Sequence, residues 1–113
     1  MLKIYHNPRC GKSREAVEIL KESGKEFEIV PYTKNILSIS ELKNIIKSLS
    51  INPIDLVRKN EIIWKNTYKN TVMSDEEIII AMHKNPKLIE RPIVISGNKA
   101  VIGRPPTEIK KII

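Results

Sequence analysis

Two short apolar segments that flank one amphipathic helix constrain the fold of this chain more than any other feature. Residues 2–5 and 27–31 read as β-strands, and the segment 11–23 between them carries apolar residues at helical spacing. Gly24 then supplies the end of this helix. A strand, a crossover helix and a second strand form a right-handed βαβ unit. The first two strands are therefore predicted to be parallel neighbours.

The middle of the chain reads as mainly helical. Ser40 is the predicted N-cap of a helix with one apolar stripe, and this helix ends before Pro53. Pro53 begins a short helix, and Ser74 begins a capping box that opens a longer one. The segment 61–70 lacks clear caps. Its larger apolar residues, which are candidates for covering the core, are Ile62, Ile63, Trp64 and Tyr68. We therefore expect a helical insert at about residues 33–90.

The last third of the chain changes to strand periodicity. Residues 93–95 and 100–102 are apolar, and the Gly-Asn pair within the connection 96–99 indicates a tight antiparallel hairpin. Pro105 then opens a terminal helix. The order βαβ, helices, β-hairpin and helix is that of a thioredoxin-like fold, an α/β fold with a mixed four-stranded sheet. We expect a single domain over residues 1–113, interrupted by the helical insert.

The composition sets the class of protein and its compartment. The 113 residues include 41% hydrophobic ones, which is enough for one compact core. No apolar run approaches the length of a membrane span, and the first residues enter a strand instead of a signal-like segment. We therefore expect a cytoplasmic protein with no membrane partner. The single cysteine, Cys10, with His6 and His83 does not make a structural zinc set, so we expect no metal and no bound cofactor.

The formal net charge of +7 raises the question of a nucleic-acid partner, because basic surfaces attract phosphate groups. Lysines are spread through every segment, often beside glutamates, and aromatic residues for base stacking make up only 4% of the chain. We therefore expect no nucleic-acid partner. The exception to this even spread is the segment 3–14, which contains basic residues and no acidic one. Such a cluster suits a small oxyanion better than a duplex.

Cys10 lies inside this basic segment, at the point where the first helix begins. The first helical turn exposes backbone N–H groups that stabilise an anion, and a thiolate is one. Arg9, Lys12 and Arg14 add positive charge. A lone cysteine is ordinarily inert core filler, but these flanks favour a reactive thiolate. Cys10 is therefore the candidate nucleophile, with Arg9 and Arg14 as helpers at most.

Two familiar motifs fail around this cysteine. Residues 10–13 end like a phosphate-binding loop in Gly-Lys-Ser, but histidine stands where that motif needs its first glycine. Ser13 occupies the second position of a Cys-x-x-Cys frame and cannot form a disulfide. Ser13 either donates a hydrogen bond to the Cys10 sulfur or caps the helix. His6 is either a protonated imidazole that favours the thiolate or a turn histidine exposed to water.

The loop His6-Asn7-Pro8-Arg9-Cys10-Gly11-Lys12-Ser13-Arg14 resembles the active-site loop of the glutaredoxin-linked arsenate reductases, a thioredoxin-like family. The resemblance continues in the same order through residues 56–60, 89–94 and 102–106, so it spans nearly the whole chain. It implies a thioredoxin-like fold and favours a functional role for the histidine. The candidate catalytic residues are therefore Cys10, His6 and Ser13.

Three arginines far apart in the sequence are implicated by the same resemblance. It implies that Arg58, Arg91 and Arg104 converge on an anion above Cys10. Arg91 precedes Pro92 at the entry of a strand, where thioredoxin-like folds keep a cis-proline that faces the active cysteine. Guanidinium groups hold a tetrahedral oxyanion through charge-assisted and often bidentate hydrogen bonds, which lysine does not reproduce.

The resemblance implies an enzyme that reduces arsenate, or a similar oxyanion, to arsenite. The Cys10 thiolate would attack arsenic, with glutathione as co-substrate and glutaredoxin as protein partner. One cysteine cannot complete a two-electron reduction alone, so a second thiol must come from solution. One alternative is an Spx-type regulator that binds RNA polymerase, although that branch typically carries the cysteine pair missing here. Another is a related glutathione-dependent thiol reductase without an arsenic role.

Overall fold

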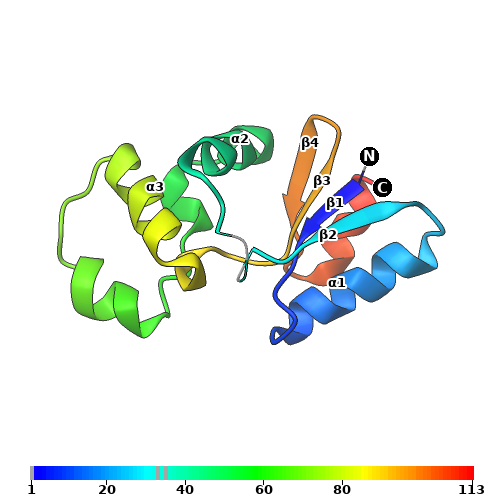
Figure 1. Ribbon diagram of the computed structural model, residues 1–113, viewed down its shortest axis with the longest axis horizontal. Helices are drawn as coiled ribbons and strands as arrows, with labels where there is room; N and C mark the ends of the chain where they lie inside the picture. The colour runs from blue at the N-terminus through cyan, green and yellow to red at the C-terminus, as the bar shows by residue number, and fades with distance from the viewer. Residues whose placement is uncertain (1, 33, 35) are drawn as a thin grey trace. The chain divides into compact units, whose positions relative to one another are not determined.

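The computed structural model describes residues 2–32, 34 and 36–113. The chain forms two compact units, of which the first comprises Met1–Asn35 with Arg91–Ile113 and the second comprises Ile36–Glu90. Figure 1 colours these segments from blue at the N-terminus to red at the C-terminus. Residue 33, the approximate start of the predicted insert, lies outside the described residues. A single domain over the whole chain stays a prediction.

The first unit is built on a mixed sheet of four strands in the described part of the chain, in the order β2-β1-β3-β4 (Figure 1). The strands are β1 (Leu2–Tyr5), β2 (Phe27–Val30), β3 (Ile93–Ser96) and β4 (Lys99–Ile102). β1 pairs in parallel with β2 and antiparallel with β3, and β3 pairs antiparallel with β4. The predicted parallel pair and the predicted hairpin are therefore both confirmed.

Helix α1 (Gly11–Glu22) connects the two parallel strands and packs on the sheet together with the C-terminal 3-10 helix η4 (Pro106–Lys111). Residues from α1, β1, β3 and η4 make one buried cluster, namely Leu2, Ile4, Ala16, Val17, Leu20, Val94 and Ile109. On α1, Leu20 follows Ala16 by four residues and Val17 by three, which is the spacing of the amphipathic helix that the sequence predicts. Gly24 has a φ of +73°, which a glycine adopts without strain, and the chain turns there into β2.

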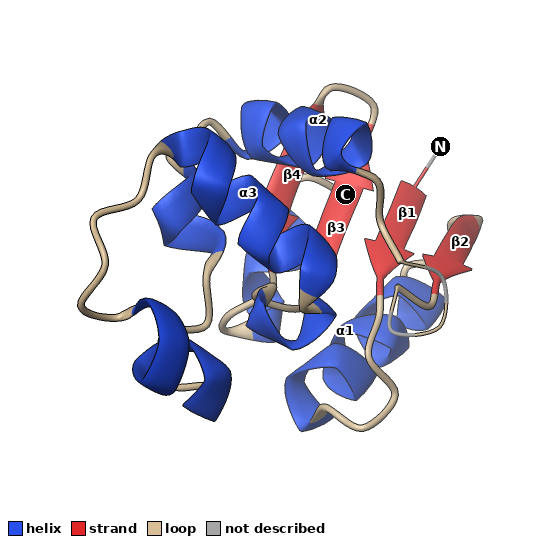
Figure 2. Ribbon diagram, turned by 60° about the vertical axis from the view of Figure 1, so that its left-hand side comes forward, coloured by secondary structure: helices blue, strands red, loops and turns tan. Residues whose placement is uncertain are grey.

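The second unit is mainly helical, as the sequence predicts, and Figure 2 shows it as helices and loops. Its elements are α2 (Ile39–Leu49), η1 (Pro53–Leu56), the π-helical turn η2 (Trp64–Tyr68), α3 (Asp75–Lys84) and η3 (Pro86–Leu88). Its core contains the fully buried side chains of Leu42, Ile45, Leu56, Met82 and Leu88. In the described part of the chain, no helix has the length and apolar character needed to cross a membrane.

The predicted N-cap of α2 is wrong by two residues. Ser38 is the N-cap, since its side-chain oxygen accepts the backbone N–H of Glu41 at 3.0 Å. The Glu41 carboxylate in turn accepts the backbone N–H of Ser38 at 3.2 Å. This reciprocal capping box needs serine and glutamate three residues apart, a spacing that Ser38 has and Ser40 lacks. Ser40 instead lies exposed within the first helical turn.

The segment 61–70, which lacks clear caps, forms the π-helical turn η2. The backbone N–H of Lys69 donates to the carbonyl of Trp64 at 2.9 Å, and the ring of Trp64 lies 5.6 Å from that of Tyr68. Trp64 is buried, but Ile62 is 73% exposed. Of the residues predicted to cover the core, Trp64 is therefore confirmed and Ile62 is wrong, because Ile62 precedes the π-helical turn and its side chain lies in solvent.

We expect Ser38→Ala to lower the free energy of unfolding by about 1 kcal/mol, because it removes the side-chain half of the α2 capping box. Ser40→Ala is the matched control, since it makes the same chemical change two residues away and removes no cap. Urea unfolding of both variants measures the difference. Equal stability of the two variants, or a larger loss in Ser40→Ala, would contradict the assignment of the cap.

Candidate active site

The loop between β1 and α1 places Cys10 at the start of the helix. The backbone N–H of His6 donates to the carbonyl of Val30 at 3.0 Å and so extends the parallel pairing by one residue. The backbone N–H of Cys10 donates to the carbonyl of Asn7 at 3.0 Å and closes a tight turn. Cys10 then has an extended backbone and is the N-cap residue of α1. Its sulfur therefore lies at the helix end where backbone N–H groups are free of intrahelical partners.

The Cys10 sulfur is surrounded by hydrogen-bond donors. Burial of the thiol by itself raises its pKa, but the backbone N–H of Ser13, the guanidinium of Arg91 and the backbone N–H of Lys12 outweigh that effect. The resulting pKa of Cys10 lies below its ordinary value. Arg104 Nη2 is also within 3.7 Å of the sulfur. These contacts favour the thiolate, which is the nucleophilic form of cysteine.

Arg91 and Arg104 reach the sulfur because the β3-β4 hairpin brings their backbones together. Arg91 precedes β3 and Arg104 follows β4, so the two paired strands place them at the same end of the sheet. Arg104 Nε donates to the backbone carbonyl of Arg91 at 2.8 Å. Both arginines precede cis-prolines, and the one at Pro92 is the predicted cis-proline, which is confirmed.

Gly103 allows this close approach of the two ends of the hairpin. Its backbone N–H donates to the carbonyl of Pro92 at 2.8 Å. A Cβ atom at Gly103 would lie 2.8 Å from Pro92 Cγ and 3.3 Å from Ile109 Cδ1, which is closer than such atoms pack. The lack of a side chain at this position therefore sets the distance between the segments that carry Arg91 and Arg104.

Tyr32 is a further residue of the site, and nothing in the sequence pattern marks it as one. It follows β2, and its side chain is 1% exposed. Burial lowers the pKa of Arg91, but the nearby Cys10 sulfur and Tyr32 phenol outweigh that effect and raise the pKa of Arg91 above its ordinary value. The available signal is topological, because the ends of parallel strands β1 and β2 lie at one edge of the sheet.

His6 and Ser13 form a hydrogen-bonded pair beside Cys10. Ser13 is fully buried, and its hydroxyl oxygen accepts the backbone N–H of Asn7 at 3.0 Å. The same oxygen lies 2.6 Å from His6 Nδ1. Desolvation, and then the charge of Arg14, lower the pKa of His6. In the tautomer with Nδ1 unprotonated, the neutral imidazole accepts a hydrogen bond from the Ser13 hydroxyl, so the serine donates one hydrogen bond and accepts another.

This pair corrects the expectations for both side chains. The Ser13 hydroxyl is hydrogen-bonded to His6 and to the backbone N–H of Asn7, and the Ser13 backbone N–H is the group that contacts the sulfur. The hydroxyl therefore neither donates to the sulfur nor caps the helix, which were its two predicted roles. The lowered pKa of His6 favours a neutral imidazole, which argues against the protonated imidazole that was one of the two alternatives for this residue. Catalytic roles for His6 and Ser13 stay predictions.

The remaining arginines have other contacts. Arg58 belongs to the second unit, where its Nη1 contacts Glu61 Oε1 at 2.6 Å and its Nε lies 3.6 Å from Glu90 Oε1. Its convergence on the anion above Cys10 stays a prediction. Arg14 Nη1 donates to the carbonyl of Pro8 at 3.0 Å and so braces the loop before the helix. Arg9 is exposed, in keeping with the minor role expected for it.

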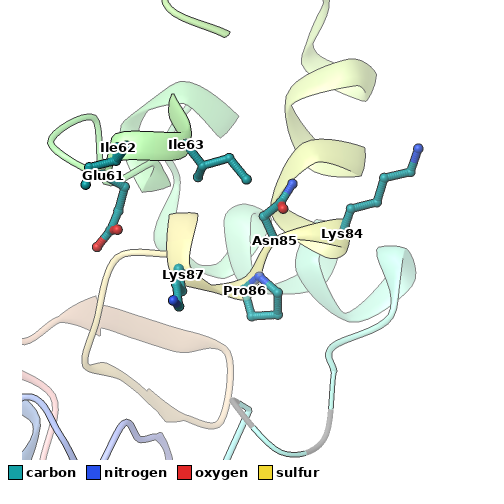
Figure 3. Close-up of a pocket in the computed structure, with 7 residues that line it drawn as sticks. All are labelled: Glu61, Ile62, Ile63, Lys84, Asn85, Pro86 and Lys87. Carbon is teal, nitrogen blue, oxygen red and sulfur yellow. The ribbon is translucent and has the colours of Figure 1, made fainter. Parts of the chain in front are cut away.

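The second unit contains two hollows that lack a nucleophilic thiol. The first has a volume of about 520 Å³ and is lined by Glu61, Ile62, Ile63, Lys84, Asn85, Pro86 and Lys87 (Figure 3). The second, of about 430 Å³, is lined by Lys59, Asn60, Trp64, Lys65 and Lys69. Among the described residues, no group of three or more His, Cys, Asp and Glu side chains is arranged to hold a metal ion.

Comparison with known proteins gives one consistent result. The sequence model of the ArsC family matches residues 5–112. The chain is 44% identical to the uncharacterized protein YfgD of Escherichia coli (strain K12), over 99% of this chain and 96% of that protein. It is 39% identical to an arsenate reductase of Haemophilus influenzae, over 97% of each chain.

Solved structures agree with the sequence comparison. An arsenate reductase from Vibrio cholerae superimposes with a TM-score of 0.94 at 36% identity, covering 99% of this chain and 97% of that one. The predicted thioredoxin-like fold is thereby confirmed.

We expect the rate of Cys10 alkylation to rise with pH around a midpoint below 9.0, the ordinary value for a thiol. Because the chain has one cysteine, the reaction reports a single group. A pKa that is lower in the folded state also means that the thiolate stabilises the fold above the unfolded pKa. This contribution is lost as the pH falls through the folded pKa.

The same protein unfolded in urea provides the control, and its alkylation profile should return to that of an ordinary thiol. Arg91→Ala should move the folded midpoint upward, since it removes a donor and a positive charge. A folded protein with the profile of the unfolded one would show that these contacts do not act on the sulfur.

Proposed function

This chain belongs to the ArsC family, and we propose that it is an arsenate reductase with Cys10 as its nucleophile. The observation that carries the proposal is the Cys10 sulfur at the start of α1, in contact with the guanidinium groups of Arg91 and Arg104. The same donors that stabilise a thiolate can stabilise an oxyanion placed next to it. Relatives named arsenate reductase match this chain over nearly its full length, which supports the assignment.

The first step is attack of the Cys10 thiolate on arsenic. A sulfur–arsenic bond forms, and one arsenate oxygen leaves as water after it takes up protons from solution. Arg91 and Arg104 neutralise the negative charge on the remaining oxygens, and the backbone N–H groups at the start of α1 add to this field. In our proposal Arg58 joins them, with the Glu61 and Glu90 contacts orienting its guanidinium.

The second step needs a thiol from outside the chain. Cys10 supplies one sulfur, and reduction of arsenic from the pentavalent to the trivalent state needs two electrons. We propose that glutathione attacks the adduct, so that arsenite leaves and a mixed disulfide joins Cys10 to glutathione. Glutaredoxin then returns the thiol by exchange with a second glutathione. A reaction with this reductant belongs to a reducing compartment, so we also propose a cytoplasmic location.

The test of this function is arsenite production by the purified protein supplied with arsenate, glutathione and glutaredoxin. Cys10→Ser is the control, because it keeps the size of the side chain and removes the nucleophile. Arsenite release above this control supports the proposal. Release equal to the control would sink the arsenate reaction and favour a thiol reductase without an arsenic role.

We expect alanine at Arg58, Arg91 or Arg104 to lower kcat/KM for arsenate roughly ten- to a hundredfold, the effect of losing one hydrogen bond to a charged group. Arg91→Lys should recover only part of the loss, since lysine restores the charge and not the planar fork. Circular dichroism confirms that each variant is folded. Full activity in any one alanine variant removes that arginine from the proposed site.

We expect turnover to require glutathione, because Cys10 has no internal cysteine to displace it from the adduct. The assay supplies thioredoxin, thioredoxin reductase and NADPH and omits glutathione. A single turnover at most should be seen. Sustained release of arsenite over many turnovers under these conditions would mean that another thiol resolves the adduct.

A further inference from the structure

Three lysines border one hollow of the second unit, and we call this site the lysine hollow. It has a volume of about 430 Å³ and is lined by Lys59, Asn60, Trp64, Lys65 and Lys69. Among the described residues, no carboxylate lines it. The charged side chains that border this concave site are therefore all positive.

The chain itself does not neutralise the three ammonium groups of the lysine hollow. In the part of the chain that the structure describes, the lysines that form ion pairs are Lys21, Lys43 and Lys111. Glu61 is the acidic residue nearest to the hollow in the sequence, but its Oε1 lies 2.6 Å from Arg58 Nη1. An arginine outside the lysine hollow therefore already takes up the charge of this glutamate.

The π-helical turn η2 fixes the backbone of two of these lysines. The backbone N–H of Lys65 donates to the carbonyl of Glu61 at 3.1 Å, and that of Lys69 donates to the carbonyl of Trp64 at 2.9 Å. Like charges four residues apart on a helical turn repel each other and destabilise the turn. A bound anion would relieve this repulsion. π-Helical turns are also rare, and they frequently lie at functional sites.

Trp64 holds the lining of the lysine hollow in place. Its side chain is buried, and its ring centroid lies 5.6 Å from that of Tyr68. The amide of Asn60 adds a neutral group that can donate a hydrogen bond to an anionic oxygen. Sites for small molecules are usually formed before the ligand arrives and have volumes of roughly 300–1,000 Å³, so the size of this hollow fits such a ligand.

We propose that the lysine hollow binds a small polyanion that carries two or more linked phosphate groups. Lysine binds phosphate as a point charge and does not require the planar geometry of an arginine contact. Linked phosphate groups bring several negative charges to one place, as three neighbouring ammonium groups require. The inference is independent of the proposed function, since it involves neither Cys10 nor arsenate.

The experiment uses pyrophosphate as the probe and the fluorescence of Trp64 as the signal. Trp64 is the only tryptophan of the chain and lines the lysine hollow, so its emission reports on this site. Titration at constant ionic strength should give a saturable change, with a higher Kd for inorganic phosphate, which carries fewer charges. Calorimetry measures the same binding without the tryptophan. If neither method detects saturable binding, or if the two anions bind equally well, the proposal is overturned.

Substitutions of single lysines locate the bound anion. Lys65→Gln and Lys69→Gln should each raise the Kd for pyrophosphate roughly fivefold, the effect of losing one charge contact in water. The matched controls are Lys84→Gln and Lys87→Gln, which remove the same charge from the other hollow of the second unit. At physiological ionic strength, where separate exposed charges are screened, these controls should leave the Kd nearly unchanged.

Two results of this comparison would overturn the proposal. An equal rise of the Kd in all four variants would mean that pyrophosphate is attracted by the net charge of the chain and not by the lysine hollow. An unchanged Kd in both Lys65→Gln and Lys69→Gln would place the anion at another site, such as the arginines beside Cys10. All four substituted lysines are exposed, so the variants should fold, and circular dichroism checks that they do.

Discussion

The stabilisation of one negative charge on the nearly buried sulfur of Cys10 is the interaction on which the site depends. Burial alone raises the pKa of the thiol, and the donors around the sulfur outweigh that effect and lower the pKa below its ordinary value. Two backbone N–H groups come from the start of α1, and two guanidinium groups come from Arg91 and Arg104. Helix α1 fixes the positions of the two backbone N–H groups, and the β3-β4 hairpin fixes the backbone positions of the two arginines.

The architecture of the first unit brings the start of α1 and the two arginines to the same end of the sheet. β1 and β3 are neighbours in the sheet, so the loop after β1 and the segment before β3 lie at the same end. The return strand β4 adds Arg104 to that end, and Gly103 permits the close packing against Pro92. The hydrogen-bonded pair of His6 and the buried Ser13 adds a further contact between the loop before α1 and the helix.

Much of this could be predicted from local patterns. The parallel βαβ pair, the Gly-Asn hairpin and the capping box at Ser74 each depend on residues close in sequence, and the structure contains all of them. The position of Cys10 at a helix start is local in the same sense. The error at the α2 cap arose because two serines precede the same glutamate, and only Ser38 has the spacing that closes the box. The segment 61–70 has no capping signal, so its wide π-helical turn had no local pattern to predict it.

The sequence by itself predicted Cys10 as the nucleophile, its basic surroundings and the use of an external thiol, because these predictions follow from residue type, local spacing and a single cysteine. Only the tertiary structure decided which side chains touch. It joined Arg91 to Arg104 and Ser13 to His6. Cys10 and Arg104 are far apart along the chain, and the contact between them depends on strand order and register, which no local pattern encodes.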